Sequence, residues 1–142
     1  MTVARIINEK GRDVVTVTAR TTLAEIATTL SERRIGAVVV MEKDAINGII
    51  SERDIVRAVA KHGGDGLTML AADWMTANVV TCDLEDTIND VMQKMTTGRF
   101  RHLPVVKHGK LAGIISIGDV VKRRIEDVER EADQIREYIA TA

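Results

Sequence analysis

The chain has 142 residues, of which 45% are hydrophobic and 29% charged, and its formal net charge is −1. This length suits one compact domain or two small interlocked units. The balanced charge and the 2% content of aromatic residues argue against a nucleic-acid interface, which needs a basic face and rings that stack on bases. Cys82 is the single cysteine, which excludes an intrachain disulfide and is typical of a reducing compartment. The longest apolar run, residues 37–41, is too short to cross a bilayer, so we expect a cytoplasmic protein.

The first half of the chain alternates short apolar runs with amphipathic stretches. Continuous runs of β-branched residues predict buried strands, whereas apolar residues three and four apart predict helices. The expected elements are a helix over residues 2–8, a strand over 14–17, a helix that Thr21 or Thr22 caps and that carries Leu23, Ile26, Ala27 and Leu30, strands over 37–41 and 46–50, and a helix over 52–61.

A glycine-rich stretch, residues 62–66, separates this half from the next and is typical of a linker. The pattern of strands and helices then starts again. The expected elements are a short helix within 67–75 that contains Trp74, a strand over 79–82, a helix that Asp86 caps and that carries Ile88, Val91, Met92 and Met95, strands over 103–106 and 111–115, and a helix from about residue 117.

The two halves are copies of one another at an offset of 65 residues. Gly48–Asp54 reads GIISERD, and Gly113–Asp119 reads GIISIGD. Each unit is a strand–helix–strand–strand–helix block that buries one face of a small sheet, so two blocks together can enclose a core. We therefore expect an α/β fold of two repeats in a pseudo-twofold pair, with repeat 1 over 1–66, repeat 2 over 67–124 and a C-terminal helical extension over 125–142.

The repeated motif places a serine near a helix N-cap and an aspartate about one turn later. A helix start offers free N–H groups and a partial positive charge, both of which favour an anion. A carboxylate beside it can accept hydrogen bonds from two neighbouring hydroxyls, as a ribose offers. The same spacing is also a helix-capping signature. Capping and ligand binding are therefore both open for Ser51 with Asp54 and for Ser116 with Asp119.

The last segment departs from the repeat. Its apolar residues are spaced four and three apart, with charges of both signs between them. One interpretation is a helix that packs on its own domain, and the other is a helix that meets another subunit. The seam consists of Val121, Ile125, Val128, Ala132, Ile135 and Ile139.

The duplicated block, the two GIISxxD motifs and the run Arg101–Val106 (RHLPVV) together resemble tandem CBS domains, also called a Bateman module. The resemblance covers about residues 3–124 and is strongest to small stand-alone bacterial CBS pairs. It implies a regulatory, non-catalytic module that binds an adenosine nucleotide between the repeats. AMP is the first expectation, and ADP, ATP, NAD(H) and S-adenosylmethionine are alternatives. The resemblance also implies a homodimer and an unidentified protein target. The composition, the short apolar runs and the spacing of histidine and cysteine predict no nucleic-acid, membrane or metal partner.

The resemblance assigns roles to residues of both repeats. Asp54 and Asp119 would take the ribose hydroxyls, and Ser51 and Ser116 would contact ribose or phosphate. Arg53 could point either to phosphate or to solvent. The base would lie against Val15, Thr16, Val17, Val80, Thr81, Cys82 and the strand residues Leu103 and Pro104, and the phosphate against Arg101 and His102.

The two copies differ in the residues at the start of the second strand of each block. Repeat 2 has Arg101 and His102 where repeat 1 has Gly36 and Ala37. We therefore expect the second site, around Asp119, to bind nucleotide better.

Two other function classes are weighed against a ligand sensor. An enzyme is disfavoured because the sequence has no nucleophile–base pair, phosphate-binding loop or metal-ligand spacing. An interaction scaffold with vestigial clefts, whose main role is dimerisation, remains the alternative. A ligand that raises the melting temperature would separate sensor from scaffold.

Overall fold

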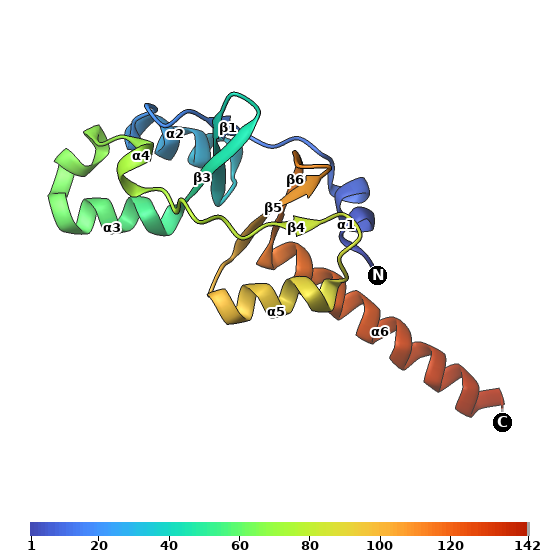
Figure 1. Cartoon of the computed structure of the whole chain (residues 1–142). Helices are drawn as coiled ribbons and strands as arrows, with labels where there is room; N and C mark the ends of the chain where they lie inside the picture. Colours follow the sequence, from blue (N-terminus) through green and yellow to red (C-terminus); the bar gives the residue numbers. More distant parts are fainter. Residues whose placement is uncertain (142) are drawn as a thin grey trace.

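Two three-stranded sheets form the centre of the computed structural model, which describes residues 1–141. Within each sheet the first strand pairs parallel with the second, which pairs antiparallel with the third. The two repeats therefore have the same topology, and the expected α/β fold of two repeats is confirmed (Figure 1). The first sheet contains β1 (Thr16–Val17), β2 (Ala37–Glu42) and β3 (Ala45–Ser51), and the second contains β4 (Cys82–Asp83), β5 (His102–Lys107) and β6 (Lys110–Ser116).

Each repeat carries two long helices, whose caps fix where they begin. In the first repeat, α2 (Leu23–Arg33) starts after Thr22, whose Oγ1 accepts a hydrogen bond from the Glu25 N–H at 3.2 Å. The helix α3 (Glu52–His62) starts directly after β3. In the second repeat, α5 (Ile88–Gly98) and α6 (Ile117–Thr141) occupy the equivalent positions.

The expected cap of α5 was wrong by one residue. Thr87 is the N-cap, and its Oγ1 accepts from the Asp90 N–H at 3.1 Å. Asp86 instead accepts from the Asp83 N–H at 2.9 Å and pairs with Lys94 at 3.2 Å. Two potential caps stand side by side in the sequence, and only the fold decides between them.

The glycine-rich stretch after α3 is not an open linker. Residues Gly63–Thr68 form a 3-10 helix, η1, that packs on α3, and the short helix α4 (Ala71–Trp74) follows. A Cβ at Gly66 would lie 2.7 Å from the Ala58 carbonyl oxygen, so the absence of a side chain allows this contact. The edge strands β1 and β4 are also shorter than expected, with two residues each.

The leading helix of each repeat packs on the other repeat. Helix α1 (Val3–Lys10) buries Val3, Ile6 and Ile7 in the core of the second repeat, whereas Ala71, Trp74 and Met75 pack in the core of the first. The motif glycines make room for this exchange. A Cβ at Gly113 would lie 2.9 Å from Ile7, and one at Gly48 would lie 2.5 Å from Met75. The leading segments are therefore exchanged between the two repeats.

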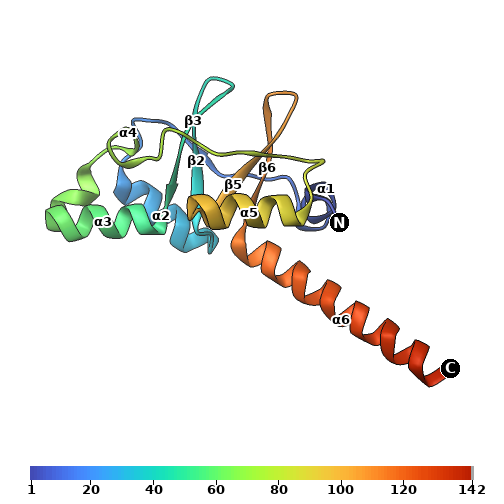
Figure 2. The ribbon, with the colours of Figure 1, turned by 60° about the horizontal axis from the view of Figure 1, so that its bottom comes forward.

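The C-terminal helix α6 is continuous across residue 124 and projects from the body of the molecule (Figures 1 and 2). Its first turns pack on α5 and β6, with Val120 and Arg123 buried. Figure 2 shows the tips of the β2–β3 and β5–β6 hairpins on one side of the molecule and α6 leaving on the other. Among the described helices, α6 included, none combines the length and apolar character that a membrane span needs.

Candidate functional site

The first motif places Asp54 at the start of α3. Its Oδ2 accepts hydrogen bonds from the Ser51 N–H at 2.8 Å and from the Ser51 hydroxyl at 3.2 Å. Asp54 is 9% exposed, and the bond to the Ser51 N–H gives the carboxylate a capping role. Within residues 1–141, no hydrogen bond reaches the other carboxylate oxygen, Oδ1. This oxygen therefore remains available to a ligand hydroxyl.

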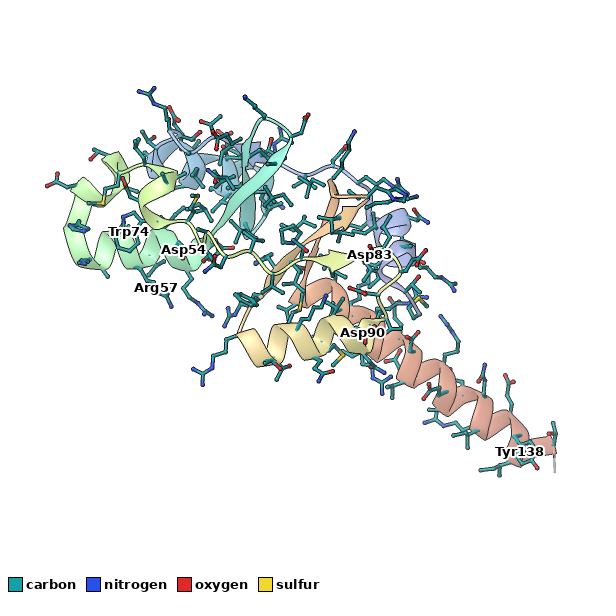
Figure 3. The ribbon with its side chains drawn as sticks, in the orientation of Figure 1. Asp54, Arg57, Trp74, Asp83, Asp90 and Tyr138 are labelled. Carbon is teal, nitrogen blue, oxygen red and sulfur yellow. The ribbon has the colours of Figure 1, made fainter. Side chains whose placement is uncertain are left out.

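A cleft of about 410 Å³ lies on this motif, between the two repeats. Figure 3 shows Asp54 and Arg57 in the part of α3 that is nearest the second repeat. The volume of the cleft falls within the range of pockets that hold small ligands. The cleft is lined by Gly36, Ile49, Ser51, Glu52, Arg53, Asp54, Arg57 and Thr76 from the first half of the chain, and by Gly98, Arg99, Phe100, Arg101 and His102 from the second.

The cleft has a positive charge excess, because its lining contains four arginines and two carboxylates. Within residues 1–141, none of the four arginines forms an ion pair. Guanidinium groups without a partner favour an anion, and their planar donors match phosphate oxygens. Arg53, which could have pointed to solvent alone, lies in this lining.

His102 reaches the Asp54 cleft although its backbone pairs with Ser116. Its side chain lies over Gly36, where a Cβ would be 2.9 Å from the imidazole Nε2. Burial lowers the pKa of His102 below 6.5, and the positive charge of Lys10 lowers it further, whereas Glu52 raises it. The imidazole is therefore mainly neutral at pH 7.

The second motif has the same backbone geometry and a different partner. Asp119 Oδ2 accepts from the Ser116 N–H at 2.9 Å, and the Asp119 N–H donates to the Ser116 hydroxyl at 3.1 Å. The Lys10 ammonium lies 2.6 Å from the same Oδ2 and also donates to the Ile114 carbonyl at 3.0 Å. Burial raises the pKa of Asp119, but the hydrogen bonds from Lys10 and Ser116 outweigh burial and the net pKa is lowered.

The cavity beside Asp119 measures only about 150 Å³. Arg123 is buried there and pairs with Glu9 of α1 at 3.2 Å, whereas its counterpart in the first repeat is the buried Ala58. The long side chain of Arg123 and the exchanged helix α1 thus fill space beside Asp119. Pockets for drug-sized ligands typically begin at about 300 Å³.

The structure corrects the expected grouping of the site residues. Arg101 and His102 line the cleft of Asp54, not the cavity of Asp119. The cleft lies between the repeats, so the motif of one repeat faces the residues that precede β5 in the other. Lys10 was missed by sequence reasoning because it lies 109 residues from Asp119 in the chain, and no local motif marks it.

The residues expected to line the base are dispersed. Val15 and Val17 pack into the first core, and Thr16 is exposed. Val80 lines a shallow hollow that shares Gly98 and Phe100 with the Asp54 cleft. The remaining expected residues make internal contacts. The Thr81 carbonyl accepts a hydrogen bond from Lys94 at 3.0 Å, and burial raises the pKa of the Cys82 thiol to about 12. Leu103 and Pro104 are buried in β5.

Comparison with known families decides the family. The CBS domain profile matches residues 3–61 and 71–126, which is most of the chain. The chain is a CBS-domain protein. Its two matches correspond to the two repeats, so this CBS pair accounts for the internal duplication.

Three similar proteins place this CBS pair among its relatives. A CBS domain-containing protein of Arabidopsis thaliana, CBSX3, mitochondrial, is 30% identical over 97% of this chain and 71% of its own length. A CBS-domain containing protein of Agrobacterium tumefaciens is 49% identical, with a TM-score of 0.85 over 87% of this chain and 99% of the other. A CBS domain protein of Pyrobaculum aerophilum, solved in complex with AMP, is 29% identical, with a TM-score of 0.74 over 84% and 89%.

Proposed function

We propose that this CBS pair is a regulatory module that binds AMP or a closely related adenosine nucleotide in the Asp54 cleft. The proposal rests on two features of the cleft. Among residues 1–141, the Oδ1 oxygen of Asp54 has no hydrogen-bond partner, and the four arginines of the lining have no ion-pair partner. One end of the cleft suits a sugar with neighbouring hydroxyls, and the other suits a phosphate. The AMP complex of the Pyrobaculum aerophilum protein supports the same ligand class.

The charge of the cleft separates the candidate ligands. AMP carries a phosphate that can neutralise the arginine excess. S-adenosylmethionine carries a sulfonium and no phosphate, so the same arginines disfavour it. ADP, ATP and NAD(H) also carry phosphate, so the charge of the cleft does not separate them from AMP. AMP has one phosphate group for the arginines and a ribose for the Asp54 carboxylate, and it is the ligand in the Pyrobaculum aerophilum complex.

The residues take distinct roles in this proposal. Asp54 Oδ1 accepts from the ribose, while Oδ2 stays engaged with Ser51 and keeps the start of α3 fixed. Arg53, Arg57 and Arg101 surround the phosphate. We assign the adenine to the apolar surface of Phe100, which lines both the cleft and the neighbouring hollow that contains Val80.

Regulation follows from the position of the cleft between the repeats. A ligand that contacts α3 and the residues before β5 together favours one arrangement of the two repeats over others. We infer that the output is conformation or assembly and not catalysis. The partner that reads this output is a separate protein or a second copy of the chain.

The experiment is isothermal titration calorimetry with AMP, adenosine and S-adenosylmethionine. We expect AMP to bind far more tightly than adenosine, because only AMP engages the arginines. Arg101→Gln should weaken AMP binding by about 10- to 150-fold, which is the loss of one charge-assisted hydrogen bond of about 1.5–3 kcal/mol. Arg20→Gln is the matched control, because Arg20 is exposed and lies outside the cleft lining.

Two results would overturn the proposal. Equal affinities for AMP and adenosine would mean that the arginines do not hold a phosphate. No binding of any nucleotide would favour the scaffold, in which the clefts are vestigial and assembly is the main role.

A further inference from the structure

The helix α6 exposes a continuous apolar stripe that no described part of this chain covers. Ile135 is 60% exposed and Ile139 is 68% exposed, and Figures 1 and 2 show this half of α6 away from the body. A stripe of large apolar side chains on a projecting helix marks a contact with another molecule. The stripe comprises the residues of the apolar seam: Val121, Ile125, Val128, Ala132, Ile135 and Ile139.

The spacing of the stripe is that of a coiled coil. Steps of four and three residues assign Ile125, Ala132 and Ile139 to heptad position a, and Val121, Val128 and Ile135 to position d. Five of the six flanking positions that face a partner helix are charged. Position e holds Lys122, Glu129 and Arg136, and position g holds Arg124, Glu131 and the uncharged Tyr138.

The flanking charges favour one orientation of two identical helices. In a parallel, in-register pair, each g residue meets the e residue five positions later in the other helix. Arg124 then faces Glu129 of the second copy, and Glu131 faces Arg136 of the second copy. All of these contacts join opposite charges, and the twofold axis repeats each of them.

The antiparallel alternative joins like charges. When the stripes overlap fully, with Ile125 opposite Ile135, each Glu129 faces Glu129 of the other copy and each Glu131 faces Glu131. Lys122 also faces Arg136. Like charges in such positions disfavour association, so the sequence of α6 discriminates against this arrangement.

We propose that α6 joins two copies of this chain through a parallel, in-register coiled coil. The stripe is short, but the helix is already formed at its base, where Val120 and Arg123 are buried in the body. The cost of starting a helix is therefore met before association. Among residues 1–141, Arg124, Glu129 and Glu131 form no ion pair, so these charges are available to the second copy. This inference is independent of the nucleotide proposal.

Sedimentation equilibrium of the full chain tests the contact. We expect a dimer at tens of micromolar, and a dissociation constant at least tenfold higher for Ile135→Asp. Gln134→Asp is the matched control, because it adds the same charge to the same turn at a position outside the stripe. A monomeric wild type, or a dimer that Ile135→Asp leaves unchanged, would overturn the proposal.

Charge exchange and cross-linking test the orientation. Glu129→Arg should weaken the parallel dimer, because it places a positive charge opposite Arg124 of the second copy. Adding Arg124→Glu should restore the dimer.

Cross-linking is a second test of the orientation. Ile135→Cys should form a disulfide-linked dimer, because a residue at position d lies opposite the same residue of the second copy only in the parallel register. The buried Cys82 does not compete, since burial raises its pKa to about 12. Failure of the double exchange to restore association, or cross-linking only between Ile125→Cys and Ile135→Cys chains, would overturn the parallel arrangement.

Discussion

Asp54 and Asp119 occupy the same place in their repeats, and both accept a hydrogen bond from the serine N–H that precedes the helix. Around them the two clefts differ. Asp54 faces a cleft of about 410 Å³ lined by arginines, whereas Asp119 faces the Lys10 ammonium in a cavity of about 150 Å³. The motif alone therefore specifies a helix cap, and the surrounding side chains decide whether the carboxylate can serve a ligand.

The difference arises from residues that the pseudo-twofold relation would make equivalent. In the exchanged segments, Ile7 and Met75 take the same place against the motif glycines, so the counterpart of Lys10, three residues further on, is the uncharged Asn78. Arg123 corresponds to Ala58, and its side chain occupies space that stays open beside Asp54. A duplicated fold has thus kept one accessible cleft and filled the other with its own charged side chains.

Neutralising each aspartate in turn gives the largest expected effect. Asp54→Asn should weaken AMP binding by about 10- to 150-fold, since it removes a charge-assisted acceptor of about 1.5–3 kcal/mol. Asp119→Asn, the matched control, should change AMP affinity little because Lys10 already engages that carboxylate. Calorimetry measures both affinities, and thermal melting checks that the variants are folded. Equal losses would mean two equivalent sites, and a larger loss at Asp119 would support the grouping that the sequence first indicated.

Removing one hydroxyl from the ligand sharpens the same comparison. If Asp54 reads the ribose, 2′-deoxy-AMP should bind the wild type more weakly than AMP by about 0.5–1.5 kcal/mol, the net value of one hydrogen bond. This gap should shrink in Asp54→Asn and persist in Asp119→Asn. The pair of substitutions, one in the protein and one in the ligand, forms a double-mutant cycle. An unchanged gap in Asp54→Asn would leave capping as the role of that carboxylate.

Lys10→Met removes the ammonium group that pairs with Asp119 in the second cleft. We expect a loss of about 0.5–1 kcal/mol in the free energy of unfolding, because the pair is partly exposed. The hydrogen bonds from Lys10 and Ser116 keep the pKa of Asp119 below its unfolded value of about 3.9. The stability from this pair is therefore complete above about pH 4 and is lost as the pH falls through the folded-state pKa.

Urea denaturation between about pH 2 and pH 7 measures this difference, because the folded-state pKa of Asp119 lies below its ordinary value. Lys122→Met is the matched control, because Lys122 lines the same cavity and forms no ion pair within residues 1–141. A difference between wild type and Lys10→Met that persists undiminished below pH 3 would show that the pair with Asp119 is not its origin.

The sequence predicted the fold well because its signals are local and occur twice. The two GIISxxD motifs, the Thr22 cap and the alternation of apolar runs each depend on neighbours within a few residues. The candidate site depends on contacts that the chain sequence does not display. Arg101 belongs to the second repeat, where its carbonyl accepts a hydrogen bond from the Ile117 N–H at 2.8 Å, yet the residue lines the cleft of Asp54 in the first repeat. Lys10 reaches Asp119 only because α1 packs on the second repeat.

The smallest expected effect concerns His102, and it tests whether that imidazole serves the Asp54 cleft. Burial first, and Lys10 second, lower the pKa of His102 in the folded protein, so between the folded and unfolded values the unfolded chain binds more protons. The apoprotein should therefore lose stability as the pH falls through about 6.5, with a slope below the 1.36 kcal/mol per pH unit of a full proton. His102→Gln should lack this loss, and His108→Gln, in an exposed turn, should retain it.

AMP should oppose the loss of stability in the wild type, because a phosphate beside His102 favours the charged imidazole. Thermal melting from pH 7.5 to 5.5, with and without AMP, measures all of these differences. If AMP shifted the wild type and His102→Gln equally at every pH, His102 would not face the nucleotide, and the cleft of Asp54 would hold its phosphate by the arginines alone.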